Sequence, residues 1–158
     1  LHISSNPGEL SEAVAPVKNR GFIKPLYGFW TSTHIGNSSG WVDWCRGKGF
    51  GNPDACSWFV LTPRNNVQVY TIATLDDLRY LVAQYPDMEV STELRSIEFL
   101  TFLDFERIAQ DYDAIHLTAE GQWATRHSKP NLNGWNCECT LWFRWCFEKV
   151  EKINEGLL

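Results

Sequence analysis

The run 137–143 is the feature of this sequence that most constrains its fold. Its side chains alternate in character, and a strand turns successive side chains to opposite faces. One face is apolar and predicts a buried core; it comprises Cys137, Cys139, Leu141 and Phe143. The other face carries Glu138, Thr140 and Trp142, so a carboxylate lies beside a hydroxyl and an aromatic ring. This second face fits either a solvent-exposed strand edge or a cleft.

A second unusual stretch lies near the start of the chain. The expected strand Gly28–Thr33 ends in Trp-Thr-Ser-Thr and runs into the glycine-containing segment 36–40. Hydroxyl side chains and backbone N–H groups left accessible by glycine suit a polar ligand. They are equally typical of a hairpin end followed by a loop of turn-forming residues. On the expected opening strand Leu1–Ser5, alternation places His2 and Ser4 on one face.

The other patterns predict a mixture of helices and strands. Helices are expected at Glu9–Val17, from Ser38–Gly40 onward with Trp41, Trp44 and Cys45 on one face, from a capping box at Thr74 and Asp77 to about Pro86, and at Asp104–Tyr112. Strands are expected at 57–62 and 67–72, joined as a hairpin through 63–66, at Asp113–Thr118, and at Cys137–Trp145. Loops are expected at 87–96 and 119–133, and a helix in the C-terminal tail. This irregular order favours the α+β class over a doubly wound parallel sheet.

Composition limits the classes of protein that the chain can represent. Its 158 residues suit a single domain, 1–158, with a real core. The net charge of −5 argues against a broad nucleic-acid-binding face, and no apolar run approaches the length of a membrane span. Five widely spaced cysteines favour reduced, buried thiols over a disulfide framework or a metal site, and hence a cytoplasmic location. A start at Leu1 leaves a secreted effector open.

Several familiar catalytic and metal-binding patterns do not occur in the sequence. The four histidines form no His-Glu-x-x-His or other zinc spacing, so no metal ligands are expected. There is no Gly-x-Ser-x-Gly elbow, and the glycine-rich segment 46–53 does not have the pattern of a phosphate-binding loop. A Cys–His nucleophile pair stays open, without a local pattern to support it.

Three short motifs occur in a recognisable order. Leu-His-x-Ser opens the first strand, an aromatic-Thr-Ser run ends the second, and a glutamate stands near the start of a late strand. This order resembles the ADP-ribosyltransferase superfamily, in the branch with a histidine–tyrosine–glutamate triad that diphtheria-like toxins and poly(ADP-ribose) polymerases share. The chain is also similar to small bacterial and phage proteins that carry the segments Lys-Pro-x-Gly-Leu-Trp-x-Ser, Trp-x-x-Trp-Cys, Tyr-Asp-Gly-Ile and Gly-Trp-Asp-Cys-x-Ser. The matching segments here are Lys24–Ser32, Trp41–Cys45, Tyr112–Ile115 and Gly134–Thr140.

The resemblance implies a fold and a set of site residues. The fold would be two small, mostly antiparallel sheets that form a central cleft with short flanking helices. His2, with Ser4 beside it, would bind the adenosine-side ribose of NAD. Trp30 would take the place of the tyrosine that stacks on nicotinamide, with Thr31 and Ser32 supporting the pocket. Glu138 would bind the 2′-hydroxyl of the nicotinamide ribose, and Glu120 is the substitute candidate for this catalytic carboxylate.

The implied function is NAD-dependent ADP-ribosyl transfer to a macromolecular acceptor, a protein or a nucleic acid, or NAD hydrolysis. NAD would be the substrate, and the protein would act as a monomer without a membrane. The loop 119–133, with Arg126, His127 and Lys129, would recognise the acceptor or would simply be a solvated loop. The alternative is a non-catalytic protein-interaction factor or effector on the same fold.

Overall fold

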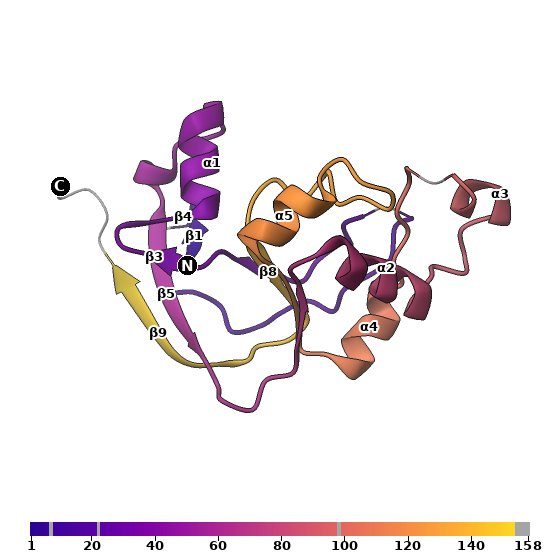
Figure 1. Cartoon of the computed structure of the whole chain (residues 1–158). Helices are drawn as coiled ribbons and strands as arrows, with labels where there is room; N and C mark the ends of the chain where they lie inside the picture. The colour runs from indigo at the N-terminus through magenta and orange to yellow at the C-terminus, as the bar shows by residue number, and fades with distance from the viewer. Residues whose placement is uncertain (7, 22, 98, 154–158) are drawn as a thin grey trace.

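Two small β-sheets and a short hairpin form the framework of the protein (Figure 1). The computed structural model describes residues 1–6, 8–21, 23–97 and 99–153. The first sheet has the order β1 (His2–Ser4), β5 (Ser57–Pro63), β9 (Phe147–Ile153), and its pairs are antiparallel. The second has the order β2 (Phe29–Thr31), β8 (Cys139–Trp142), β7 (Ala114–Leu117), β6 (Val69–Ile72), and only β6–β7 is parallel. The hairpin pairs β3 (His34–Ile35) with β4 (Ser38–Ser39).

Five α-helices and one 3₁₀ turn in the described residues complete the fold, which confirms the α+β class. They are α1 (Gly40–Lys48), the 3₁₀ turn η1 (Pro53–Ala55), α2 (Leu75–Gln84), α3 (Thr92–Arg95), α4 (Phe105–Asp111) and α5 (Ala119–Thr125). Figure 1 shows α1 beside the first sheet. It shows α2 and α4 on the side of the second sheet that faces away from the first sheet.

The two sheets meet where β1 lies against the end of β2. The Leu1 nitrogen donates to the Ser32 carbonyl at 2.5 Å, and the Ser32 N–H donates back to the Leu1 carbonyl at 2.9 Å. His2 adds a third link, because its Nδ1 lies 2.9 Å from the Trp30 carbonyl oxygen. These contacts bring the two sequence motifs of the N-terminal region into one place.

Three clusters of buried side chains hold the layers together. The largest lies between the second sheet and the helices α2 and α4, and includes Leu78, Leu81, Phe105, Ile108, Ile115 and Leu141. A second cluster, around Trp142 and Phe147, fills the space between the two sheets. The third packs α1 on the first sheet through Val42 and Trp58. Burial of side chains of this size is the main source of stability in such a domain.

Local capping signals in the sequence are confirmed. The Ser39 side chain accepts from the Val42 N–H and caps α1, and Thr74 and Asp77 form the reciprocal capping box of α2. The strand at 113–118 is also confirmed as β7, and the helix at 104–112 as α4. The apolar face of α1 is only partly as expected, since Val42 and Cys45 are buried while Trp41 and Trp44 are half-buried and stack on each other.

The predicted hairpin between 57–62 and 67–72 is wrong. The two strands exist, but β5 pairs with β1 and β9 in the first sheet, whereas β6 pairs with β7 in the second. The predicted helix in the C-terminal tail is wrong for a related reason, because 147–153 forms the long strand β9 that occupies the free edge of β5. Both errors concern pairing between segments distant in sequence.

The predicted helix at Glu9–Val17 is also wrong. The segment has no helical residues, and it ends in an isolated bridge between Lys18 and Leu26. Pro16 explains this, because proline lacks an N–H and disfavours the helical conformation of the residue before it. The Ala15 carbonyl instead accepts from Gly28 N–H.

Two predicted loops contain helices, and one strand is shorter than expected. The segment 119–133 begins with α5, which the Thr118 side chain caps by accepting from the Gly121 N–H at 3.0 Å. The segment 87–96 holds the single turn α3. The last predicted strand, 137–145, is reduced to β8, so Glu138 lies just before the strand.

Gly121 permits the closest approach of α5 to the second sheet. A Cβ atom at this position would lie 2.0 Å from the Ile72 carbonyl oxygen. We therefore expect Gly121→Ala to lower the free energy of unfolding by about 1–3 kcal/mol, because helix and strand must separate. Urea unfolding measures this change.

The control is Gly47→Ala in α1, where an added Cβ has no described atom within 4 Å apart from its chain neighbours and the backbone of its own helix. This variant should be more stable by about 0.5–1 kcal/mol, as alanine favours the helix. Equal stability of the Gly121→Ala and wild-type proteins would contradict the close approach.

Candidate functional site

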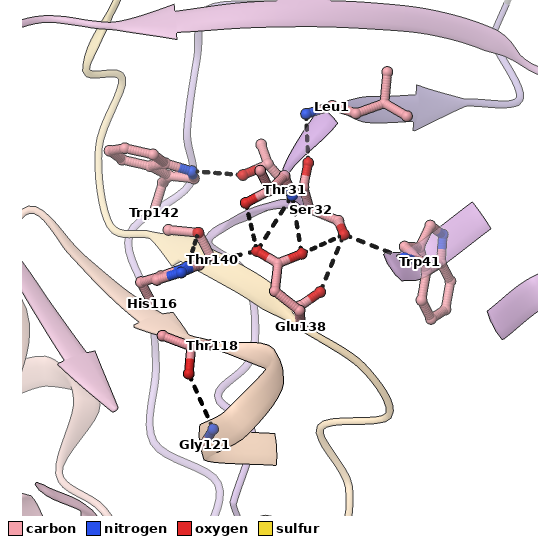
Figure 2. A network of polar contacts seen from close by, with 11 residues as sticks. Leu1, Thr31, Ser32, Trp41, His116, Thr118, Gly121, Glu138, Thr140 and Trp142 are labelled. Atoms are coloured by element: carbon pink, nitrogen blue, oxygen red, sulfur yellow. Dashed lines mark hydrogen bonds and ion pairs between the residues drawn. The ribbon is translucent and has the colours of Figure 1, made fainter. Parts of the chain in front are cut away.

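The carboxylate of Glu138 is held by three donors from the end of β2 (Figure 2). Ser32 Oγ donates to Oε2 at 2.7 Å and Thr33 Oγ1 donates to Oε1 at 2.7 Å. The Thr33 N–H lies 3.0 Å from Oε2 and 3.2 Å from Oε1. The side chain of Glu138 is only 14% exposed. Hydrogen bonds to a charged acceptor are stronger than neutral ones, so this carboxylate is fixed in one orientation.

Ser32 connects the carboxylate to the rest of the site. It is 2% exposed, and its Oγ also accepts from the Trp41 N–H in the first turn of α1 at 3.2 Å. Its hydroxyl proton can reach either the carboxylate of Glu138 or the Glu138 carbonyl, which lies 3.1 Å away. Through its backbone bonds to Leu1, the same residue reaches the first sheet. Ser32 therefore ties β1, α1 and Glu138 together.

A row of polar side chains crosses the second sheet next to Glu138. The strand register aligns Thr31 with Thr140, Thr140 with His116, and His116 with Thr71. Paired residues point to the same face of a sheet, so four polar residues line up on the face that the large core does not use. His116 Nδ1 lies 2.8 Å from Thr140 Oγ1 and 3.7 Å from Glu138 Oε1.

The first cavity, of about 340 Å³, lies between β1, β2 and α1. Its lining combines aromatic rings, cations and hydrogen-bonding groups: His2, Arg20, Lys24, Trp30, Thr31, Ser32, Trp41 and Asn136 are among them. The Lys24 ammonium lies 5.4 Å from the centre of the Trp30 ring. Burial lowers the pKa of Lys24, so an anion beside it would restore the stabilisation that solvent no longer supplies. Rings and cations together fit a ligand that has both flat rings and negative charge.

His2 is oriented within this cavity by its neighbours. Its ring stacks on Phe29 with 4.5 Å between centroids, and since a carbonyl only accepts, Nδ1–H donates to the Trp30 oxygen. Burial lowers the pKa of His2 below its ordinary value of 6.5. The ring is therefore neutral at pH 7, which leaves Nε2 as a hydrogen-bond acceptor.

The cysteines near the site are poor nucleophiles. Cys137 and Cys139 line the first cavity, and all five cysteines of the chain are unpaired. Burial raises the pKa of Cys137 to about 12 and that of Cys139 further still. The thiolate is the reactive form, so these thiols act as apolar lining at neutral pH. In the described part of the chain, no three histidine, cysteine or acidic side chains are grouped as metal ligands.

Glu138 itself faces a different space from His2 and Trp30. It lines a cavity of about 350 Å³ together with His116, Thr118 and Asp43, which we call the third cavity. A second cavity of about 380 Å³ is lined by His34 and His116, and shares Thr31 and Ser32 with the first. The carboxylate is one hydrogen bond, through Ser32, away from the lining of the first cavity.

The structure brings most of the residues expected for the site together. His2, Trp30, Thr31 and Ser32 line the first cavity, with Glu138 bonded to Ser32. Ser4 does not join them in that lining, and its Oγ accepts from the Asn6 N–H. Glu120 lies exposed in the first turn of α5.

Sequence reasoning assigned no role to three described residues beside the carboxylate or the first cavity, namely Lys24, Trp41 and His116. Thr33, whose hydroxyl was expected to suit a polar ligand, donates to Glu138. Lys24 and Trp41 belong to the motif segments quoted above, so a signal for them existed. His116 enters only through strand register, which no local pattern specifies.

Comparison with protein-family models, with curated proteins and with solved structures finds no match. The described helices include none that is long and apolar enough to cross a membrane.

The lowered pKa of His2 predicts a pH-dependent stability. Between the pKa of His2 in the folded protein and 6.5, the unfolded chain binds more protons at this residue than the folded protein does. The contribution of the neutral His2 ring to the free energy of unfolding should therefore be present above pH 6.5 and be lost as the pH falls through the folded pKa. Urea unfolding at pH 7.5 and 5.5 measures the effect, and NMR titration of the His2 ring gives its pKa.

His2→Gln is the matched variant, since it retains a side-chain donor but does not titrate. Its stability should fall less between these two pH values than that of the wild type. An NMR pKa at or above 6.5 would contradict the burial of this ring.

Proposed function

We propose that the protein is an NAD-dependent ADP-ribosyltransferase that modifies a macromolecular acceptor, or an NAD glycohydrolase where water is the acceptor. One observation carries the proposal. A fixed, nearly buried carboxylate, Glu138, lies one hydrogen bond from a cavity that combines His2, Trp30 and Lys24. These are positions that the superfamily resemblance assigns to NAD binding and catalysis, with Lys24 added by the structure.

The chemistry of NAD suits the lining of the first cavity. Nicotinamide and adenine are flat rings, for which Trp30 and Trp41 offer stacking surfaces. The diphosphate is anionic, and Lys24 with Arg20 supplies the cations that it needs. The neutral His2 ring offers Nε2 to a ribose hydroxyl. A strongly negative chain, of net charge −5, thus places two cations where one anionic ligand would bind.

The reaction breaks the bond between nicotinamide and C1′ of the ribose. The bonding electrons go to the nicotinamide ring nitrogen, which becomes neutral, and positive charge develops on the ribose. With the nicotinamide ribose at the Ser32 wall of the first cavity, the Glu138 carboxylate behind that wall would stabilise the charge electrostatically, and its hydrogen-bond donors hold it in place before the reaction starts. The acceptor then forms the new bond to C1′ and releases a proton. Wall residues such as Cys137 and Cys139 limit competing water.

The arrangement of the strands is consistent with this proposal. The histidine-bearing β1 lies beside β2, and β2 pairs with β8 in the register Thr31–Thr140. The three motifs of the resemblance therefore come from adjacent strands at the junction of two mainly antiparallel sheets. A cleft of the superfamily type would lie at this junction.

A non-catalytic interaction factor on the same fold is the second candidate. Its support is a set of large apolar side chains that stay exposed: Trp123 is 75% exposed, Ile35 72% and Phe99 61%. Isolated exposed apolar residues are common, so these become evidence only if a partner covers them. A non-catalytic interaction factor would not explain why the carboxylate of Glu138 is held in a fixed position.

Glu138→Gln distinguishes the two candidates. Nicotinamide release from NAD, with and without a cell extract, should fall by about 10²–10³-fold in this variant, the range typical of losing one preorganised electrostatic group. Glutamine keeps the size of the side chain but removes the charge. Glu120→Gln should change the rate by no more than about twofold.

Retained turnover in the double variant Glu138→Gln, Glu120→Gln would contradict the assignment. Release without extract would indicate a hydrolase, and release only with extract a transferase. Tight NAD binding without any release would favour the non-catalytic candidate.

Lys24→Gln tests the cationic side of the first cavity, which would bind the diphosphate. We expect NAD to bind about tenfold more weakly, because a hydrogen bond to a charged group contributes about 1.5–3 kcal/mol. Calorimetric titration at low and high salt measures the change. The affinity of the wild type for NAD should fall more steeply with salt than that of the Lys24→Gln variant.

The matched control is Lys18→Gln, an exposed lysine paired with Glu106. It should bind NAD like the wild type. Equal weakening by both variants would show a general charge effect instead of a contact in the cavity.

A further inference from the structure

We propose that the third cavity is the acceptor site, that His116 is the base that takes the acceptor's proton, and that the acceptor is a serine or threonine hydroxyl of a protein. The inference rests on the proposed function, because it concerns the second half of the same reaction. It starts from the position of Glu138 between the lining of the first cavity and the third cavity.

The first and the third cavity, on either side of the Glu138 carboxylate, differ in the side chains that line them. The first cavity, on the Ser32 side, holds the rings and cations that fit NAD. The third cavity, which Glu138 itself lines, has hydroxyl groups, Asp43 and His116, and its lining contains no lysine or arginine in the described residues. Cleavage of a glycosidic bond passes through an oxocarbenium-like transition state. The nucleophile commonly attacks from the face opposite the leaving group, where a base activates it. With NAD in the first cavity, the third cavity lies on the other side of Glu138, and an acceptor would approach from there.

His116 is placed to be that base. Its side chain is 25% exposed and lines both the second and the third cavity. With a proton on Nδ1, the Nδ1–H donates to Thr140 Oγ1 at 2.8 Å, and the Glu138 carboxylate 3.7 Å away favours this tautomer. In this tautomer Nε2 is the nitrogen that can take a proton, and it makes no hydrogen bond within the described chain. The Thr140 hydrogen bond orients the ring, and an oriented histidine base is what activates hydroxyl nucleophiles in many enzymes.

The charges around the third cavity select among acceptors. Asp43 and Glu138 would repel a carboxylate or a phosphate, so acidic side chains and the nucleic-acid backbone are disfavoured. A neutral hydroxyl is compatible with this lining, but it needs a base because it is a weak nucleophile while protonated. The step balances without another reactant: the hydroxyl oxygen bonds to C1′, nicotinamide leaves with the bonding electrons, and the hydroxyl proton passes to Nε2.

The experiment uses the full chain, NAD and four synthetic peptides that are alike except for one central serine, arginine, glutamate or lysine. Mass spectrometry measures addition of ADP-ribose to each peptide, and nicotinamide release is followed in parallel. We expect the serine peptide to be modified. In His116→Ala, transfer should fall about 100-fold or more, the typical contribution of a general base, while calorimetry shows NAD binding within about twofold of wild type.

Chemical rescue separates a base from a structural role. Added imidazole should restore transfer in His116→Ala, since a small base can enter the vacated space, and a purely structural loss would not respond. His116→Asn should lose transfer to a similar degree because it keeps a hydrogen-bonding side chain without a base. This second variant keeps the test valid if His116→Ala folds poorly.

The outcomes separate the inference from the function on which it rests. Modification of the arginine, glutamate or lysine peptide instead of the serine peptide would overturn the hydroxyl acceptor while supporting the transferase. Wild-type transfer by His116→Asn would overturn the base. No nicotinamide release by the wild type with any peptide or with extract would overturn the proposed function and this inference with it.

Discussion

The hydrogen bonds of Ser32 are the interaction on which the site depends. A single buried hydroxyl and the two backbone groups of the same residue reach β1, the first turn of α1 and the Glu138 carboxylate. A buried donor or acceptor that loses its partner costs about 1–3 kcal/mol, so each contact constrains the others. The two sheets, the first helix and the carboxylate therefore hold fixed positions relative to one another.

The sequence predicts those elements whose signals are local. The capping box of α2 and the strand β7 follow from a few neighbouring residues, and both form as expected. The alternation around Glu138 also holds, since Leu141 enters the large core while Trp142 packs between the sheets. For the site, the resemblance carried by the short motifs groups His2, Trp30 and Ser32, and the structure places all three in the lining of one cavity.

Other parts could not be predicted because they depend on pairing over long distances. The edge of β5 is taken by β9, whose residues lie 84 (Pro63–Phe147) to 95 (Trp58–Ile153) positions later than their partners, so a local hairpin does not form. His116 joins the carboxylate only because two consecutive registers, Thr31–Thr140 and Thr140–His116, align three strands. The helix α5 depends on Gly121, whose missing side chain admits the Ile72 carbonyl. None of these contacts can be predicted from a short segment of the sequence, because each depends on residues far apart in the chain.

The contact between Ser32 and Glu138 joins residues 106 positions apart. A chain emerging from the ribosome therefore carries the ring- and cation-bearing half of the site long before it carries the carboxylate. Bringing such distant segments together costs chain entropy that is recovered only when β8 has paired with β2. A partly synthesised or truncated chain that ends before Glu138 has no carboxylate at this place, so the site is incomplete until the second sheet has formed. Under the proposed function, in which NAD is consumed, this order of synthesis would confine activity to the finished fold.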